Sequence, residues 1–362
     1  MLRLLDKEGI MKKYLQKSLF VTGMVLFFTA AKAQDIHFSQ YNSSPLALNP
    51  ALAGMNACDY RVYANFRTQW MTISSGNTYR TFAGGADMSI GKITKYNSFA
   101  GLGISFFSDQ AGDVNFNTNR VDLSFAYHFM LNRKGTMQIS AGLQGGFNHR
   151  SINQSKATFD SQYDPQTGTV DPNGARENFG RTRVMFGDAG LGLVYSAMTR
   201  NEQNFHLGFA LNHVNQPRIS FYPSGRDAAT TGNERLGMKI TIHGGAALPT
   251  GKRLTIMPNF LVLVQGTAYE FNVGCNFKTA LGNDPARSTT AFHMGVQYRG
   301  LLDAVIVNAR FDIKGFSAGL SYDINVSKLL PASKSIGAPE VSLMYQGCAR
   351  KKPRPGHCPV MF

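Results

Sequence analysis

The residue types that could carry chemistry are scattered along this chain, and no spacing among them defines an enzyme. The sequence contains no His-Glu-x-x-His pair and no phosphate-cradling loop, and its Gly-x-Ser-x-Gly string at 315–319 lies inside an alternating stretch. Its glycine-rich strings, residues 101–103 and 190–193, lie inside alternating stretches. Glycine in such a stretch leaves space on an inner face or permits curvature. We therefore expect no catalytic residues and no cofactor.

Cysteine and histidine near the C-terminus offer a different kind of chemistry. Cys348, His357 and Cys358 could bind a metal ion, or Cys348 and Cys358 could close the tail as a disulfide. Structural zinc sites use four ligands, and adjacent His and Cys rarely both reach one ion. An exported protein can hold disulfides. The sequence leaves both possibilities open and favours the disulfide.

Two further sets contain possible metal ligands: the acids Asp160, Asp164, Asp171 and Glu177, and the histidines His128, His206, His243 and His293. The acids do not match the twelve-residue calcium loop, and their surroundings are typical of a solvated loop. The histidines fall on separate predicted strands. They suggest a metal or proton site, but hydrated polar groups on an inner face explain them more simply.

The elements that position these residues have a polarity period of two, which is typical of β-strands. Five stretches place every ionisable side chain on one face: 60–67, 120–129, 205–212, 269–278 and 316–325. A charge facing lipid at mid-depth costs about 2–4 kcal/mol, whereas the outer face of a soluble sheet tolerates it. The segregation predicts an all-β fold, a transmembrane antiparallel β-barrel.

About fourteen such stretches follow one another, most of them close to the length that a tilted strand needs to cross a membrane. They lie near 59–67, 79–91, 99–107, 118–131, 136–148, 186–196, 203–213, 236–247, 253–265, 268–279, 290–299, 303–312, 315–325 and 340–346. Parity places the long connections 149–185, 214–235 and 326–339 at one end and several tight turns at the other. Short periplasmic turns and long extracellular loops are the expected asymmetry.

Composition agrees with a barrel. Charged residues make up 16% of the chain, below the roughly 25% of soluble domains. Mean hydropathy is nevertheless −0.17, which is too polar for a bundle of membrane helices. Barrel strands need only half of their residues to be apolar.

Residues 1–33 have the pattern of a signal peptide, with a better start at Met11 than at Met1. A basic region precedes the apolar run 18–30, and Ala31-Lys32-Ala33 is a small-x-small cleavage site. A short membrane anchor is the alternative. Cleavage removes six basic and two acidic residues, which lowers the net charge from +15 to +11. The remaining basic residues are dispersed, so we expect contact with outer-membrane lipid and no nucleic-acid binding.

The mature chain divides into three parts. Residues 34–57 do not alternate and contain helix-breaking prolines, so we expect a periplasmic or lumen segment. Residues 58–346 form the outer-membrane β-barrel. Residues 347–362 form a basic, proline-rich tail. We expect both termini to face the periplasm.

Two stretches resemble the PorP/SprF family of Bacteroidota outer-membrane proteins. They are the mature start QDIHFSQYNSSPLALNPALAG (34–54) and the closing strands FHMGVQYRGLLDAVIVNARFDIKGFSAGLSYDINVSKL (292–329) with EVSLMYQGC (340–348). The resemblance implies a non-enzymatic component of type IX secretion and gliding. It would support the secretion or surface anchoring of a cargo protein that carries a type B C-terminal sorting domain. The implied partners include ring, lipoprotein and peptidoglycan-linked components of the secretion system.

A cargo could use the long loops, the polar lumen or, only if the barrel were not fully closed, an exposed strand edge. The candidate cargo-binding residues face the lumen: Arg61, Asn65, Arg67, Asp87 and Arg120. An internal network of salt bridges that fills the barrel is the competing interpretation of these side chains. The competing function is an outer-membrane transport channel of the fatty-acid-channel type, for a hydrophobic or small polar solute. A barrel-embedded lipid hydrolase is disfavoured, because the outward positions are almost uniformly apolar.

Overall fold

A computed structural model describes residues 35, 37–56, 58–69, 78–93, 98–112, 114–132, 135–157, 159–171, 180–221, 234–282, 288–300, 303–327 and 336–348. The predicted signal peptide, the tail beyond Cys348 and Glu177 lie outside these residues. Among the described residues no helix is long and apolar enough to cross a membrane.

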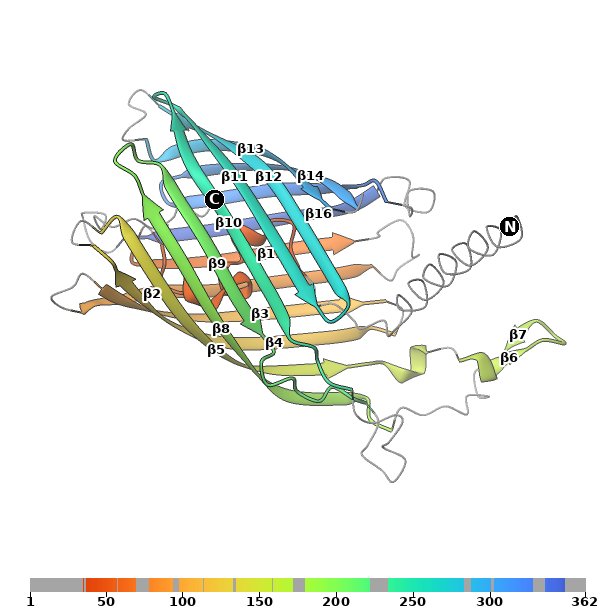
Figure 1. The fold of residues 1–362 in the computed structure, drawn as a ribbon. Helices are drawn as coiled ribbons and strands as arrows, with labels where there is room; N and C mark the ends of the chain where they lie inside the picture. The colour runs from red at the N-terminus through yellow and green to blue at the C-terminus, as the bar shows by residue number, and fades with distance from the viewer. Residues whose placement is uncertain are drawn as a thin grey trace, which may run out of the picture. The chain divides into compact units, whose positions relative to one another are not determined.

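Fourteen antiparallel strands close into one barrel, as the period of two predicts (Figure 1). The strands are β1 (Tyr60–Gln69), β2 (Tyr79–Ile93), β3 (Ser98–Ala111), β4 (Phe116–Met130), β5 (Met137–Ser151), β8 (Arg183–Met198), β9 (Asn204–Asn212), β10 (Lys239–Thr250), β11 (Leu254–Gln265), β12 (Ala268–Leu281), β13 (Thr290–Arg299), β14 (Ala304–Ile313), β15 (Phe316–Asn325) and β16 (Ile336–Gly347). Each strand pairs with its neighbours in the chain, and β1 pairs with β16.

The two faces of the wall differ sharply in polarity. Outward side chains such as Leu123, Phe147 and Leu320 are 63%, 62% and 62% exposed. Inward neighbours such as Asp122 and Ser321 are buried. Strands alternate their side chains between faces, so the predicted segregation of charge is confirmed.

The connections differ between the two ends of the barrel. Residues 152–182 and 213–238 both connect strands at one end, which we call the loop end. The first of these contains a small hairpin, β6 (Tyr163–Asp164) with β7 (Thr169–Val170), that alternation did not predict. The opposite end, the turn end, has connections such as Lys314-Gly315. There φ is 49° and 86°, as two-residue hairpins require.

The last strand is longer than expected. It begins at Ile336 and not near 340, because residues 336–339 pair with β15 beyond the end of the β1–β16 ladder. That ladder runs from Tyr60 opposite Gly347 to Arg67 opposite Glu340. Pro339 comes next and has no N–H to donate.

A disulfide joins Cys58 to Cys348 across the β1–β16 seam at the turn end. The predicted Cys348–Cys358 pairing is therefore wrong, as is a metal site that uses the Cys348 sulfur. Barrel closure brings Cys58, which is 290 positions away in the chain, beside Cys348. The sequence around Cys348 alone could not indicate this partner. Cys275 on β12 is a free thiol.

Replacing Cys58 by serine should lower the free energy of unfolding by about 2–4 kcal/mol, because the unfolded chain loses a cross-link. The measurement is the heating midpoint of the shift between folded and unfolded electrophoretic mobility. Reductant should reproduce the effect in the wild type, and Cys275→Ser is the matched control. A Cys58→Ser midpoint equal to that of the wild type would contradict the stabilising role.

Candidate functional site in the barrel lumen

The N-terminal residues 35 and 37–56 lie inside the barrel, and we call them the lumen segment (Figure 1). Asp35 contacts the loop-end residues of β10 and β11, whereas Gly54 bonds to Asp87 on β2. The chain then leaves at the turn end, where Asp59 bonds to Gly347. The segment thus runs through the barrel from the loop end to the turn end.

Two prolines shape the middle of the segment into short helical turns. These are η2 (Tyr41–Ser43), α2 (Pro45–Leu48) and η3 (Pro50–Leu52). Proline suits the first position of a helix but cannot continue one. The side chain of Asn49 accepts a hydrogen bond of 2.9 Å from Ala51 N and so caps η3.

Glycines on three wall strands let the segment approach the backbone of the wall. A Cβ added at Gly101 would collide with Ala53, one at Gly142 with Ala51, and one at Gly192 with Asn49. The lumen space that the glycine-rich strings predict therefore exists here, and the segment fills it.

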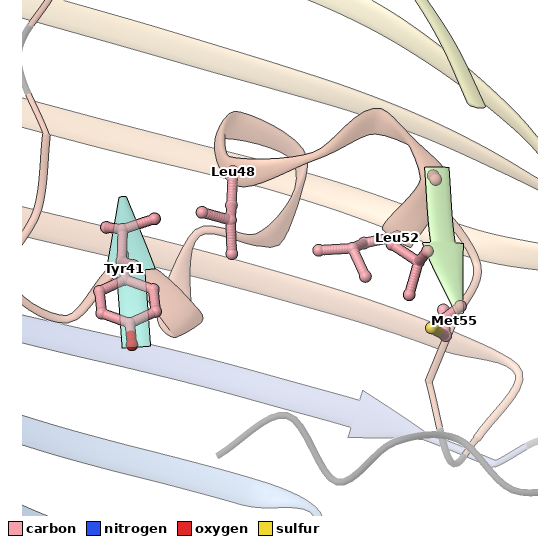
Figure 2. Packing of buried hydrophobic residues seen from close by; sticks show 7 residues of the cluster. Tyr41, Leu48, Leu52 and Met55 are labelled. Atoms are coloured by element: carbon pink, nitrogen blue, oxygen red, sulfur yellow. The ribbon is translucent and has the colours of Figure 1, made fainter. Parts of the chain in front are cut away.

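Apolar side chains hold residues 41–55, which we call the inner half of the segment, against the wall. One buried cluster consists of Tyr41, Leu48, Ala51, Leu52 and Met55 of the segment with Val194 and Leu261 of the wall (Figure 2). A second joins Leu46 and Ala53 to Tyr63, Ala126 and Met344. Burial of this kind stabilises by about 25 cal/mol per Å² of apolar surface, so the inner half is a packed part of the fold.

A buried ion pair holds the turn-end part of the segment. Arg61 donates to Asp87 twice, through Nε at 2.9 Å and Nη2 at 3.0 Å. Asp87 also accepts from Gly54 N at 2.8 Å, and Arg61 Nη2 donates to Leu52 O at 3.3 Å. Such bidentate pairs fix geometry as well as charge.

A second network holds the segment near Ser39. Glu340 accepts from Ser39 N at 2.8 Å and from Gln40 N at 2.9 Å. Arg67 donates to His37 O and Ser39 Oγ, and it pairs with Asp323 at 2.9 Å. Arg299 reaches the same Asp323 oxygen at 3.0 Å. Two wall carboxylates and two wall guanidinium groups therefore meet around the segment.

Asp35 ends the described segment in a third set of contacts. Its carboxylate lies 2.6 Å from His213 Nε2, 3.6 Å from Lys239 Nζ and 3.9 Å from Arg120 Nη1. Burial opposes the charge on Asp35, but Lys239 and His213 hold the pKa of its carboxyl well below the usual range. Burial also opposes the charge on His213, but Asp35 and Asp188 raise its pKa.

The five predicted lumen residues all point inward, and four of them take part in these networks. Arg61 and Asp87 pair with each other, Arg67 belongs to the second network, and Arg120 contacts Asp35 and Asp122. Asn65 is buried, and its amide has no hydrogen-bond partner among the described residues. Their binding of a cargo stays a prediction.

Sequence reasoning missed the partners that complete the networks: Asp323, Glu340, Arg299, Lys239, His213 and Gln265. Alternation placed Asp323 on the inward face. The period of two does not, however, show which strands face one another across the lumen.

Two of the four histidines bind the lumen segment. His128 Nε2 donates to Ala53 O at 2.8 Å, and Asn49 Nδ2 donates to His243 Nε2 at 3.2 Å. His206 lies with its ring centroid 6.1 Å from that of His243, and His293 pairs with Asp312 at 2.8 Å. Across the described part of the chain no group of three or more His, Cys, Asp or Glu side chains could hold a metal ion.

The acidic loop is built from local turns. Asp164 accepts from Gln166 N at 2.8 Å and from Thr167 Oγ1 at 2.9 Å. This Asx-type arrangement is typical of polar loops.

The closed wall, apolar outside and polar within, defines an integral outer-membrane β-barrel with its lumen occupied by its own N-terminal segment. Sequence comparison with protein families matches residues 30–345 to the type IX secretion system membrane protein PorP/SprF. The chain belongs to this family, as its two ends predict.

Similar solved structures are also bacterial barrels. The CymD monoaromatic hydrocarbon channel has a TM-score of 0.47 and 11% identity, and the match covers 84% of this chain and 93% of that one. The Pseudomonas putida toluene transporter TodX has a TM-score of 0.42 and 9% identity, with 86% and 93% covered. For a Pseudomonas aeruginosa FadL homologue the values are 0.42 and 8%, with 79% and 90% covered. Likenesses at this level carry no argument about function. A search of curated proteins gave no match.

Replacing Gly142 by alanine should displace η3, because the added Cβ collides with the backbone of Pro50 and Ala51, which is held by buried apolar packing. We expect a loss of about 1–3 kcal/mol in the free energy of unfolding, together with faster proteolysis within residues 45–56. Gly145→Ala on the same strand is the control, since nothing lies within 4 Å of its Cβ. Equal behaviour of the two variants would show that the contact is unimportant.

Replacing Asp87 by leucine should leave the Arg61 charge buried and unpaired, at a cost of about 3–5 kcal/mol. The double variant Arg61→Met/Asp87→Leu should recover most of that loss, because neither charge then remains. Urea unfolding in lipid vesicles measures all three proteins. If the double variant is as unstable as Asp87→Leu alone, the hydrogen bonds to the segment matter more than charge pairing.

Proposed function

We propose that this barrel is a non-enzymatic component of type IX secretion that supports the secretion or surface anchoring of one cargo protein with a type B C-terminal sorting domain. The single observation that carries the proposal is the family match over residues 30–345. Our proposal extends to gliding where the cargo is an adhesin. The partners we propose are the cargo and the ring, lipoprotein and peptidoglycan-linked components of the secretion system.

The orientation we propose puts the loop end outside the cell and the turn end in the periplasm. The length of connections 152–182 and 213–238 supports it, because outer-membrane barrels carry their long loops outside. A cargo would then meet the long loops first, and loops are where binding residues concentrate. The end of β16 at Gly347 would leave the C-terminal tail on the periplasmic side. Asp35 lies at the loop end, so in this orientation the start of the lumen segment is on the outer side, contrary to the expectation that both termini face the periplasm.

The filled lumen supports a docking role over free passage. The segment contacts wall strands on every side, from β1 and β2 through β5, β8 and β10 to β16. Among the candidate cargo-binding residues, Arg61, Arg67, Asp87 and Arg120 already have partners. In our proposal they contact cargo only where the segment has moved away from them.

Deletion of the gene tests the proposal. We expect one surface protein with a sorting domain to disappear from the cell surface, as surface proteomics would measure, while uptake of hydrophobic solutes stays unchanged. Complementation with Gly145→Ala should restore the surface protein, and Gly142→Ala should restore less of it. Selective loss of solute uptake with an intact surface proteome would instead establish the transport channel.

A further inference from the structure

Four wall residues surround Asp35 at the loop end, and we call them the carboxylate cradle: Arg120, His213, Lys239 and Gln265. Three of them approach the carboxylate of Asp35 at 3.9, 2.6 and 3.6 Å. The fourth, Gln265, accepts a hydrogen bond of 2.7 Å from Asp35 N. Arg120 lies on β4, Lys239 on β10 and Gln265 on β11, and His213 directly follows β9. Barrel closure therefore assembles the cradle without the segment.

The charges of the cradle require an anion. Arg120 has a second carboxylate partner in Asp122 at 2.8 Å, and His213 has one in Asp188 at 2.7 Å. Among the carboxylates of the described residues, only that of Asp35 lies within 4.0 Å of Lys239 Nζ. The Lys239 side chain is 10% exposed, and a buried ammonium without an anion is costly.

The cradle also lies where the segment meets solvent. The side chains of Asp35 and His37 are 15% and 24% exposed, whereas Phe38 and Ser39 are 3% and 0% exposed. Asp35 is the one acidic residue between positions 34 and 57. A second carboxylate can therefore reach the cradle by displacing only the outer end of the segment.

We propose that the carboxylate cradle is a binding site for a carboxylate of a polypeptide that enters from the loop end, and that Asp35 occupies it as an internal competitor. Residues 38–56 stay in place during this exchange, because apolar packing and buried ion pairs hold them. That the polypeptide is a secreted cargo rests on the proposed function, whereas the binding site itself does not.

Purified full-length barrel in detergent tests the site with a fluorescent, end-blocked peptide, Ala-Gln-Asp-Ile-His, the sequence of residues 33–37. The comparison peptide has Asn in place of Asp. We expect the Asp peptide to bind Asp35→Asn barrel at least about tenfold more tightly than wild-type barrel, because the competitor has lost its charge. The Asn peptide should show no such gain. Equal binding of the two peptides to Asp35→Asn, or equal binding of the Asp peptide to both barrels, would overturn the proposal.

A wall variant locates the site. Adding Lys239→Gln to Asp35→Asn should abolish the preference for the Asp peptide, while Lys278→Gln, an inward lysine near the turn end, should leave it unchanged. Loss of the preference in both variants would point to general charge and overturn the assignment. Folding is checked by the mobility shift on heating, and Asp35→Ser replaces Asp35→Asn if the latter does not fold.

The two proposals can fail separately. Peptide binding needs no secretion machinery, so a charge-selective cradle together with an unchanged surface proteome after gene deletion would sink only the cargo role. Loss of the surface protein after gene deletion, without charge-selective peptide binding, would contradict only the cradle.

Discussion

Closure of the strand ladder between β1 and β16 is the constraint on which the rest of the structure depends. A barrel in a membrane can leave no backbone edge unpaired, and closure removes the edge by joining residues near 60 to residues near 347. The same joint brings Arg67 beside Glu340 and Cys58 beside Cys348. Pairs that no local stretch of sequence contains thus arise from a single topological event.

Closure also creates an interior whose polar and charged side chains need hydrogen-bond and ion-pair partners. Inward positions carry the charges that lipid excludes from the outer wall, and a narrow interior offers them less water than a surface would. The lumen segment answers part of this demand with backbone groups: Ser39 N and Gln40 N bind Glu340, and Gly54 N binds Asp87. The segment is therefore a structural component of the barrel, and its non-alternating sequence reflects a site with walls on all sides.

The wall could be predicted from the sequence because the alternation within each strand shows which of its side chains face the lipid and which face the lumen. Charge segregation in stretches such as 120–129 needs no knowledge of neighbours, and the strand count followed from it. The contents of the lumen could not be predicted in the same way. Arg61 and Arg67 were recognised as inward, but their partners Asp87 and Asp323 lie 26 and 256 positions away. The Cys348 pairing failed for the same reason, since its partner is set by closure and not by proximity in the chain.

The lumen segment is not uniform in how it is held, and this division bears on function. Its inner half packs Leu48, Leu52 and Met55 against the wall and passes over glycines that leave no room for adjustment. Its outer end relies on ion pairs at a partly hydrated opening. Apolar packing is lost only when the whole contact separates, whereas an ion pair can exchange one carboxylate for another without opening the structure. In our proposal the inner half of the lumen segment therefore stays packed while its outer end takes part in recognition, so docking does not require the lumen to empty.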